Sequence, residues 1–286
     1  MGSFKGHVLP GSLFLLVGLW HIWNSVMKYV ANPKSHRVRI WHPVPGISSN
    51  LKYLEIYIIV IGSFVDMCIE FFYSTHLKFV VDGTLNPSHM NDFEHAGMLL
   101  MFFILGVTVL ISEKTRYLPL PHGVLEIIAA MAFFAEYLLF NFHSTSHAGL
   151  EGRYHQLLVL LVGLCVMSAV LAAAFPKSFV VDLLGGITFT LQGTWFYQVA
   201  FALYGPMMPT GCSIEDHEIV CQSREFEIRG QLLANFQLGV IVLSLLTMVV
   251  FLFGFAASRC GHPSLYQSNN ESQDTKYNQN GIALHI

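Results

Sequence analysis

The chain has 286 residues, of which 53% are hydrophobic and only 12% are charged, and its mean hydropathy is +0.54. A soluble domain carries about 25% charged residues, so this composition argues against a soluble protein and predicts an integral membrane protein. The net charge of −3, without a cluster of Lys and Arg, argues against a nucleic-acid partner. The expected partners are the lipid bilayer and, for an enzyme, a lipid substrate, and the oligomeric state stays open.

Seven stretches have the length and apolar character of membrane-spanning helices, which need about 20 mostly apolar residues. They are Val8–Val30, Leu51–Ser74, Phe93–Ser112, Pro121–Phe142, Arg153–Phe175, Phe179–Tyr204 and Gly230–Ala257. The connections are mostly short, so we expect residues 1–257 to form an all-α bundle of seven antiparallel transmembrane helices. Residues 258–286 are rich in Asn, Gln and Ser and are expected to form a disordered tail.

The distribution of Lys and Arg predicts the orientation of this bundle, because short cytoplasmic loops are enriched in them. The richer side carries Lys28, Lys34, Arg37, Arg39, Lys52, Lys114, Arg116, Lys177 and Arg259. The N-terminus is then non-cytoplasmic and the C-terminal tail cytoplasmic. Cys212 and Cys221 flank a loop on the non-cytoplasmic side, where a disulfide is expected and two free thiols are the alternative.

Histidines gather beside predicted helices three, four and five, and this topology places them near the non-cytoplasmic face. Two of them, at i and i+4, could ligate one metal ion from a single helix, with further ligands from the neighbouring helices. The candidate ligands are His95, His143, His147 and His155, and the candidate metal is zinc. Glu94 or Glu136 would then be the acid or base of a metal-dependent hydrolysis of a lipid amide or ester.

Other functions of these residues stay open, including a structural hydrogen-bond network and proton handling. Further polar residues lie inside the predicted helices, where a charged side chain costs roughly 2.5–3.5 kcal/mol. They are His7, His21, Asp66 and Glu70. A transporter or pH-responsive module would pass protons or metal ions along this polar row, whereas a membrane scaffold or trafficking protein would use it only to hold its helices together.

Two cytoplasmic features are interpreted as structural. The Ser35–Gly46 connection combines Trp, Arg and Pro residues and is expected to anchor the chain at the lipid headgroups. His122 and Glu126 are one helical turn apart and are expected to form a local bonded pair.

Several short motifs stand out along the chain. They are Gly6–Ser12, Gly18–His21, Trp41–Gly46, Phe93–His95, His143–His155, His155–Leu158 and Leu191–Phe196. With these motifs the chain resembles the transmembrane protein 45-like family, and most closely its plant-type branch of viral-response-like proteins, over nearly all of its length up to Ala257. The resemblance implies a seven-helix multipass protein of the endomembrane system or plasma membrane, without established catalytic residues. The architecture is also similar to that of seven-helix zinc hydrolases such as alkaline ceramidases and adiponectin receptors, a likeness of fold alone.

Overall fold

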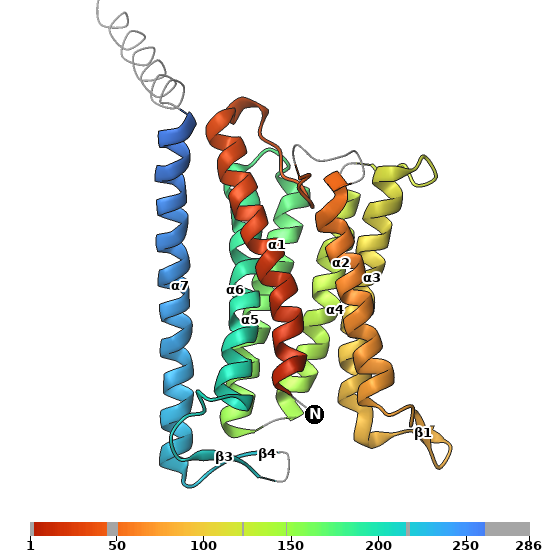
Figure 1. The fold of residues 1–286 in the computed structure, drawn as a ribbon, viewed down its shortest axis with the longest axis vertical. Coiled ribbons are helices and arrows are strands. Elements are labelled where there is room, and N and C mark those ends of the chain that lie inside the picture. The colour runs from red at the N-terminus through yellow and green to blue at the C-terminus, as the bar shows by residue number, and fades with distance from the viewer. Residues whose placement is uncertain (1–2, 45–50, 122, 147, 216–217, 261–286) are drawn as a thin grey trace, which may run out of the picture.

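The computed structural model describes residues 3–44, 51–121, 123–146, 148–215 and 218–260, which form seven α-helices and two short β-hairpins (Figure 1). The helices are α1 (Phe4–Ala31), α2 (Leu54–Cys68), α3 (Met90–Lys114), α4 (Val124–Ser146), α5 (Gly149–Ala174), α6 (Phe179–Tyr204) and α7 (Arg224–Cys260). A 3₁₀ turn at Leu51–Tyr53 precedes α2, and a π-helical turn at Ile69–Ser74 continues it. Two further 3₁₀ turns are Pro33–Ser35 and Pro87–His89.

Six of these helices are long and apolar enough to cross a membrane, which agrees with six of the seven predicted spans. The exception is α6, which forms over the predicted residues but contains polar side chains such as Asp182 and Gln192. Both side chains are buried because α6 packs between α1 and α5 inside the bundle. A helix covered by other helices does not need the uniformly apolar surface that lipid requires.

The helices extend further than predicted at the end of the bundle where α1 begins. α4 continues past Phe142 to Ser146, and α5 begins at Gly149 instead of Arg153. Glu151 lies in the first turn of α5, where a carboxylate interacts favourably with the helix dipole. Polar residues assigned to loops from the sequence therefore lie on helices and occupy defined faces.

Two hairpins were not expected for an all-α fold. β1 (Val80–Val81) pairs with β2 (Thr84–Leu85), and β3 (Cys212–Glu215) pairs with β4 (Glu218–Cys221), both antiparallel. Cys212 and Cys221 form a disulfide across the second hairpin. The fold is therefore mostly helical, and the strands are confined to connections on one end of the bundle (Figure 1).

The most extensive contact between two helices joins α1 to α6. Glycine residues in this contact let the two helix backbones approach closely. A methyl group on Gly18 would lie 2.5 Å from the backbone nitrogen of Thr190, and one on Gly186 would lie 2.8 Å from that of Ile22. Small residues let helix backbones approach in this way in membrane proteins. The core beside this contact contains Trp195, whose side chain is completely buried.

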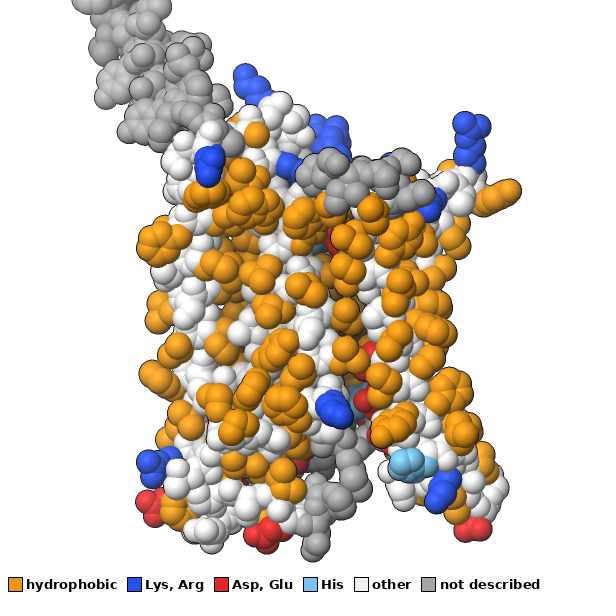
Figure 2. Space-filling view, in the orientation of Figure 1, with side chains coloured by type: hydrophobic (Ala, Val, Ile, Leu, Met, Phe, Trp, Pro, Cys, Tyr) orange, Lys and Arg blue, Asp and Glu red, His pale blue; other side chains and the backbone are white. Residues whose placement is uncertain are grey.

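Polar surface is concentrated at the two ends of the molecule (Figure 2). Hydrophobic side chains cover the middle of the face that the figure shows, as expected for a surface in contact with lipid. Lys and Arg side chains are prominent at the upper end, where α1 and α7 end, and acidic side chains lie at the lower end beside the hairpins.

Candidate functional site

Four histidines from four helices meet at the end of the bundle where α1 begins. The ring centroids of His7 and His155 are 5.7 Å apart, those of His155 and His143 are 5.1 Å apart, and those of His143 and His95 are 5.3 Å apart. His7, His143 and His155 are buried. We refer to these four residues as the histidine cluster.

The Nδ1 atom of each ring in the histidine cluster faces an oxygen acceptor. His7 Nδ1 lies 2.9 Å from the carbonyl oxygen of Ser3, and His155 Nδ1 lies 2.9 Å from that of Glu151. A carbonyl can only accept, so both rings carry a proton on Nδ1 and, when neutral, a lone pair on Nε2.

Carboxylates face the other two rings of the cluster at ion-pair distances. His95 Nδ1 lies 3.7 Å from Glu70 Oε2, and His143 Nδ1 lies 3.8 Å from Glu94 Oε2. Glu70 comes from the π-helical turn after α2, a kind of helix irregularity that is frequent at functional sites. Asp66 lies on α2, one helical turn before Glu70, and is buried. It extends the row of ionisable side chains formed by the histidine cluster and Glu70.

The structure separates two other predicted residues from this cluster. Glu136 lies on α4 seven residues before His143, and its Oε1 accepts a hydrogen bond of 2.7 Å from Gln192. Seven residues correspond to about 10 Å along a helix. Glu136 therefore lies on the same side of α4 as His143, as predicted, but about 10 Å away along the helix axis. His21 lies fourteen residues after His7 and belongs to a second cluster. His147 lies outside the described residues.

Within the described part of the chain, no three His, Cys, Asp or Glu side chains are already arranged around a common metal position. The zinc site predicted from the sequence is therefore not preformed by the described residues.

A second polar cluster lies towards the other end of the bundle and is built on two buried carboxylates. Glu55 Oε1 lies 2.7 Å from His21 Nε2, and Glu55 Oε2 accepts a hydrogen bond of 2.7 Å from the backbone nitrogen of His42.

Lys28 Nζ lies 2.9 Å from His42 Nδ1. Burial, together with the nearby charges of His21 and Lys28, lowers the pKa of His42, so its neutral ring accepts this hydrogen bond. Because the pKa is lower in the folded chain, the stability that His42 contributes falls as the pH drops below about 6.5.

Asp182 of α6 is the second carboxylate. Its Oδ2 accepts a hydrogen bond of 2.6 Å from Ser25 and lies 3.2 Å from His36 Nε2, and its Oδ1 accepts one of 3.4 Å from the backbone nitrogen of Arg39. These contacts draw the chain after α1 into the bundle. The described part of the Ser35–Gly46 connection is therefore partly buried: His36 and His42 are largely inaccessible, whereas Arg37 and Arg39 are exposed. Its contact with lipid headgroups stays a prediction.

The sequence carried a weak signal for this second cluster. Asp182 interrupts an apolar stretch, which is costly unless the carboxylate finds a partner. Its partners lie about 140 residues earlier in the chain, and no periodicity within one helix connects them. The predicted pair of His122 with Glu126 involves a residue outside the described part of the chain.

Comparison with known proteins gives a family of unknown function. A model described as "Family of unknown function (DUF716)" matches residues 122–254, which include α4, α5, α6 and most of α7. The chain is 23% identical over 237 residues to the mouse protein named transmembrane epididymal protein 1A, covering 77% of this chain and 72% of that protein. It is 22% identical over 237 residues to rat transmembrane epididymal protein 1, with the same coverage.

These matches correct the resemblance drawn from the short motifs. The assignment to the transmembrane protein 45-like family is wrong, because the matching family model and the relatives carry other names. The six apolar helices and the transmembrane relatives together establish a multipass membrane protein.

Proposed function

We propose that this membrane protein binds a divalent transition-metal ion, with zinc as the first candidate, at the histidine cluster. The observation that carries the proposal is the orientation of the rings. An Nδ1 proton held by a carbonyl or carboxylate fixes a metal-ligating histidine and leaves its Nε2 for the metal, and this is the usual outer support of zinc ligands. His7 and His155 have the carbonyl form of this support, and His95 and His143 face carboxylates.

The spacing of the rings is also compatible with a shared ion. Two imidazoles that each hold zinc at 2.0–2.1 Å have ring centroids roughly 5 Å apart. The neighbouring pairs of the cluster are 5.1, 5.3 and 5.7 Å apart. Because no three of the described His, Cys, Asp or Glu side chains surround one point, metal binding by these residues would require the rings to turn about their side-chain bonds.

Uptake of protons alone is the competing function. The row of imidazoles continues into Glu70 and Asp66, which are groups that hold protons as readily as metals. Metal binding and proton uptake make different predictions for purified protein.

Metal analysis of the wild type and two variants tests the proposal. Protein purified in mild detergent without chelators should retain about one zinc ion per chain, the stoichiometry of a single His-ligated site. The double variant His143→Ala/His155→Ala should lose it. His76→Asn is the matched control, because His76 is exposed and has a φ of 49°, a conformation that Asn tolerates. Elemental mass spectrometry measures the metal, and the unfolding temperature shows whether each variant folds.

Retention of zinc by a folded double variant would contradict the proposal. So would a wild type that stays metal-free when titrated with zinc. A metal-free wild type whose fluorescence changes on titration with acid, with no such change in the double variant, would instead establish proton uptake.

We also propose that α6 spans the membrane as a seventh helix, with the N-terminus non-cytoplasmic and the C-terminus cytoplasmic. Seven crossings put the two ends of the chain on opposite sides, as the Lys and Arg distribution requires. The disulfide between Cys212 and Cys221 supports this orientation, because such bonds persist in oxidising compartments.

Epitope tags on the two ends test the topology in intact cells. If the protein is at the cell surface, antibody should reach the N-terminal tag directly and the C-terminal tag only after permeabilisation. For an internal membrane, protease protection of sealed vesicles replaces the antibody, and the C-terminal tag should be digested. Finding both tags on one side would refute the seventh crossing.

A further inference from the structure

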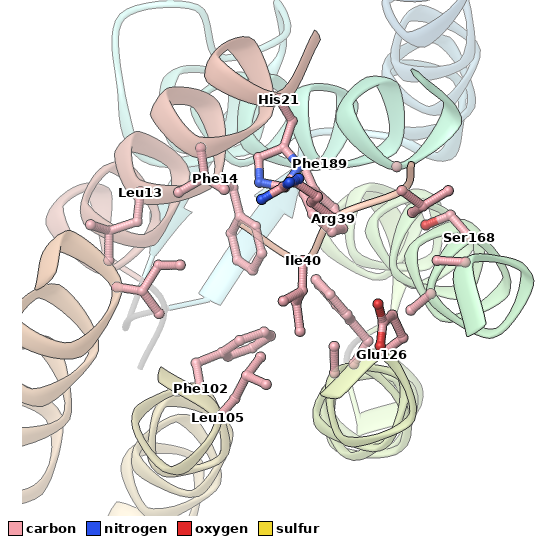
Figure 3. Close-up of a pocket in the computed structure, with 18 of the residues that line it drawn as sticks. Leu13, Phe14, His21, Arg39, Ile40, Phe102, Leu105, Glu126, Ser168 and Phe189 are labelled. Carbon is pink, nitrogen blue, oxygen red and sulfur yellow. The ribbon is translucent and has the colours of Figure 1, made fainter. Parts of the chain in front are cut away.

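A cavity of about 130 Å³ lies inside the bundle beside the second polar cluster and extends along α1 to within one turn of His7 (Figure 3). Residues from α1 to α6 and the segment after α1 surround it. Its walls are mainly apolar, with four phenylalanines from four helices: Phe14, Phe102, Phe133 and Phe189. Along α1 the lining runs from Pro10 to His21, which corresponds to roughly 16 Å of helix. The cavity is therefore narrow and elongated.

Charged side chains occur at the end of the cavity near the segment after α1. Arg39 and Glu126 both line it, and Figure 3 places Arg39 with His21 on one side and Glu126 across from them. Glu55 and Asp182 accept from histidines, backbone amides and Ser25, and neither forms an ion pair with the guanidinium of Arg39 in the described part of the chain.

Among the described residues, neither the guanidinium of Arg39 nor the carboxylate of Glu126 forms an ion pair. The mouth of an apolar cavity thus presents one positive and one negative group on opposite sides. A ligand that carries both charges close together would satisfy both groups, whereas a purely anionic ligand would face repulsion from Glu126.

The size of the cavity limits which amphiphilic molecules it can bind. Pockets that enclose a drug-sized molecule measure about 300–1,000 Å³, so this cavity is too small for two acyl chains and can enclose only part of a single one. A slender chain along α1 fits the elongated shape, with its remainder outside the cavity. The phenylalanine rings would bury it, and burial contributes about 0.8 kcal/mol for each CH₂ group.

We propose that the cavity binds a single-chain lipid with a zwitterionic headgroup. The chain lies among the phenylalanines, the phosphate meets Arg39, and the ammonium meets Glu126. This proposal is independent of metal binding, because the histidine cluster shares no residue with the cavity lining.

Binding of lipids with one chain and three different headgroups tests the proposal. The full chain is placed in nanodiscs, and radiolabelled oleoyl lysophosphatidylethanolamine, oleoyl lysophosphatidic acid and monooleoylglycerol are the zwitterionic, anionic and neutral probes. The zwitterionic probe should bind saturably and most tightly. Arg39→Gln and Glu126→Gln should each weaken it roughly tenfold, the usual size of a lost charge-assisted contact. Arg37→Gln is the matched control, because Arg37 is exposed and does not line the cavity.

A cavity-filling variant separates the chain site from the headgroup site. Ala129→Leu places a larger side chain in the cavity and should weaken the zwitterionic and neutral probes alike, while the unfolding temperature shows that the protein is folded. Equal affinity for all three probes would overturn the proposal, as would unchanged binding in folded Arg39→Gln. Tightest binding of the anionic probe, insensitive to Glu126→Gln, would also overturn it.

Discussion

Replacement of Glu55 with alanine is expected to lower the unfolding temperature of the protein in detergent by roughly 10 °C or more. Glu55 is 4% exposed and accepts from His21 and from the backbone of His42. Its loss leaves a buried histidine without its counter-charge and a buried N–H without an acceptor. Removal of one partner from a buried pair costs about 3–5 kcal/mol.

The conservative change Glu55→Gln should be less severe, because an amide oxygen still accepts one of the two hydrogen bonds. Glu113→Ala is the matched control, since Glu113 is an exposed carboxylate at the same end of the bundle. Thermal unfolding followed by circular dichroism measures all three variants. An equal unfolding temperature for Glu55→Ala and Glu113→Ala would show that the pair contributes nothing to stability.

Replacement of Gly18 with alanine is the second large effect that we expect. The added methyl group would lie 2.5 Å from the backbone nitrogen of Thr190, and a backbone atom cannot rotate away as a side chain could. α1 and α6 must therefore separate along their most extensive contact. Overpacking of this kind costs about 1–3 kcal/mol, and we expect a value near the upper end.

Gly185→Ala on α6 provides a sharp comparison. A methyl group there would have no neighbour within 4 Å, and alanine favours helix more than glycine does. Its unfolding temperature should match or slightly exceed that of the wild type, whereas Gly18→Ala should unfold several degrees earlier. If both variants unfold together, the close approach of α1 and α6 is not a determinant of stability.

Hydropathy alone predicted where the helices lie, because the membrane imposes one simple requirement on every lipid-facing segment. The ends of the helices were less predictable. Ser144 and Thr145 lie in the last turn of α4, and their hydroxyls hydrogen-bond to carbonyls three residues earlier. Such residues favour loops in most sequences, so their helical state depends on local bonding that composition does not reveal.

The candidate site was partly predictable for a related reason. The alternation of membrane crossings places His95, His143 and His155 at one end of the bundle, and the structure brings them together. Helical periodicity predicts which residues share one side of a helix but not which of them are close together along its axis. For this reason Glu136 was grouped with His143 although it lies two turns away. The contact of His7 with His155 depends on how α1 packs among later helices, and a single sequence contains no direct signal of that packing.

The contact between α1 and α6 sets an order of events during synthesis. α6 begins roughly 150 residues after α1 ends, and at 5–20 residues per second the ribosome needs about 10–30 s to make that length. During this interval Ser25 has no Asp182 to bond, and the glycine face of α1 has no helix against it. The first helix of the chain must therefore wait for the helix that makes its most extensive contact. Until α6 is made, the folded-state neighbour available to α1 is α2.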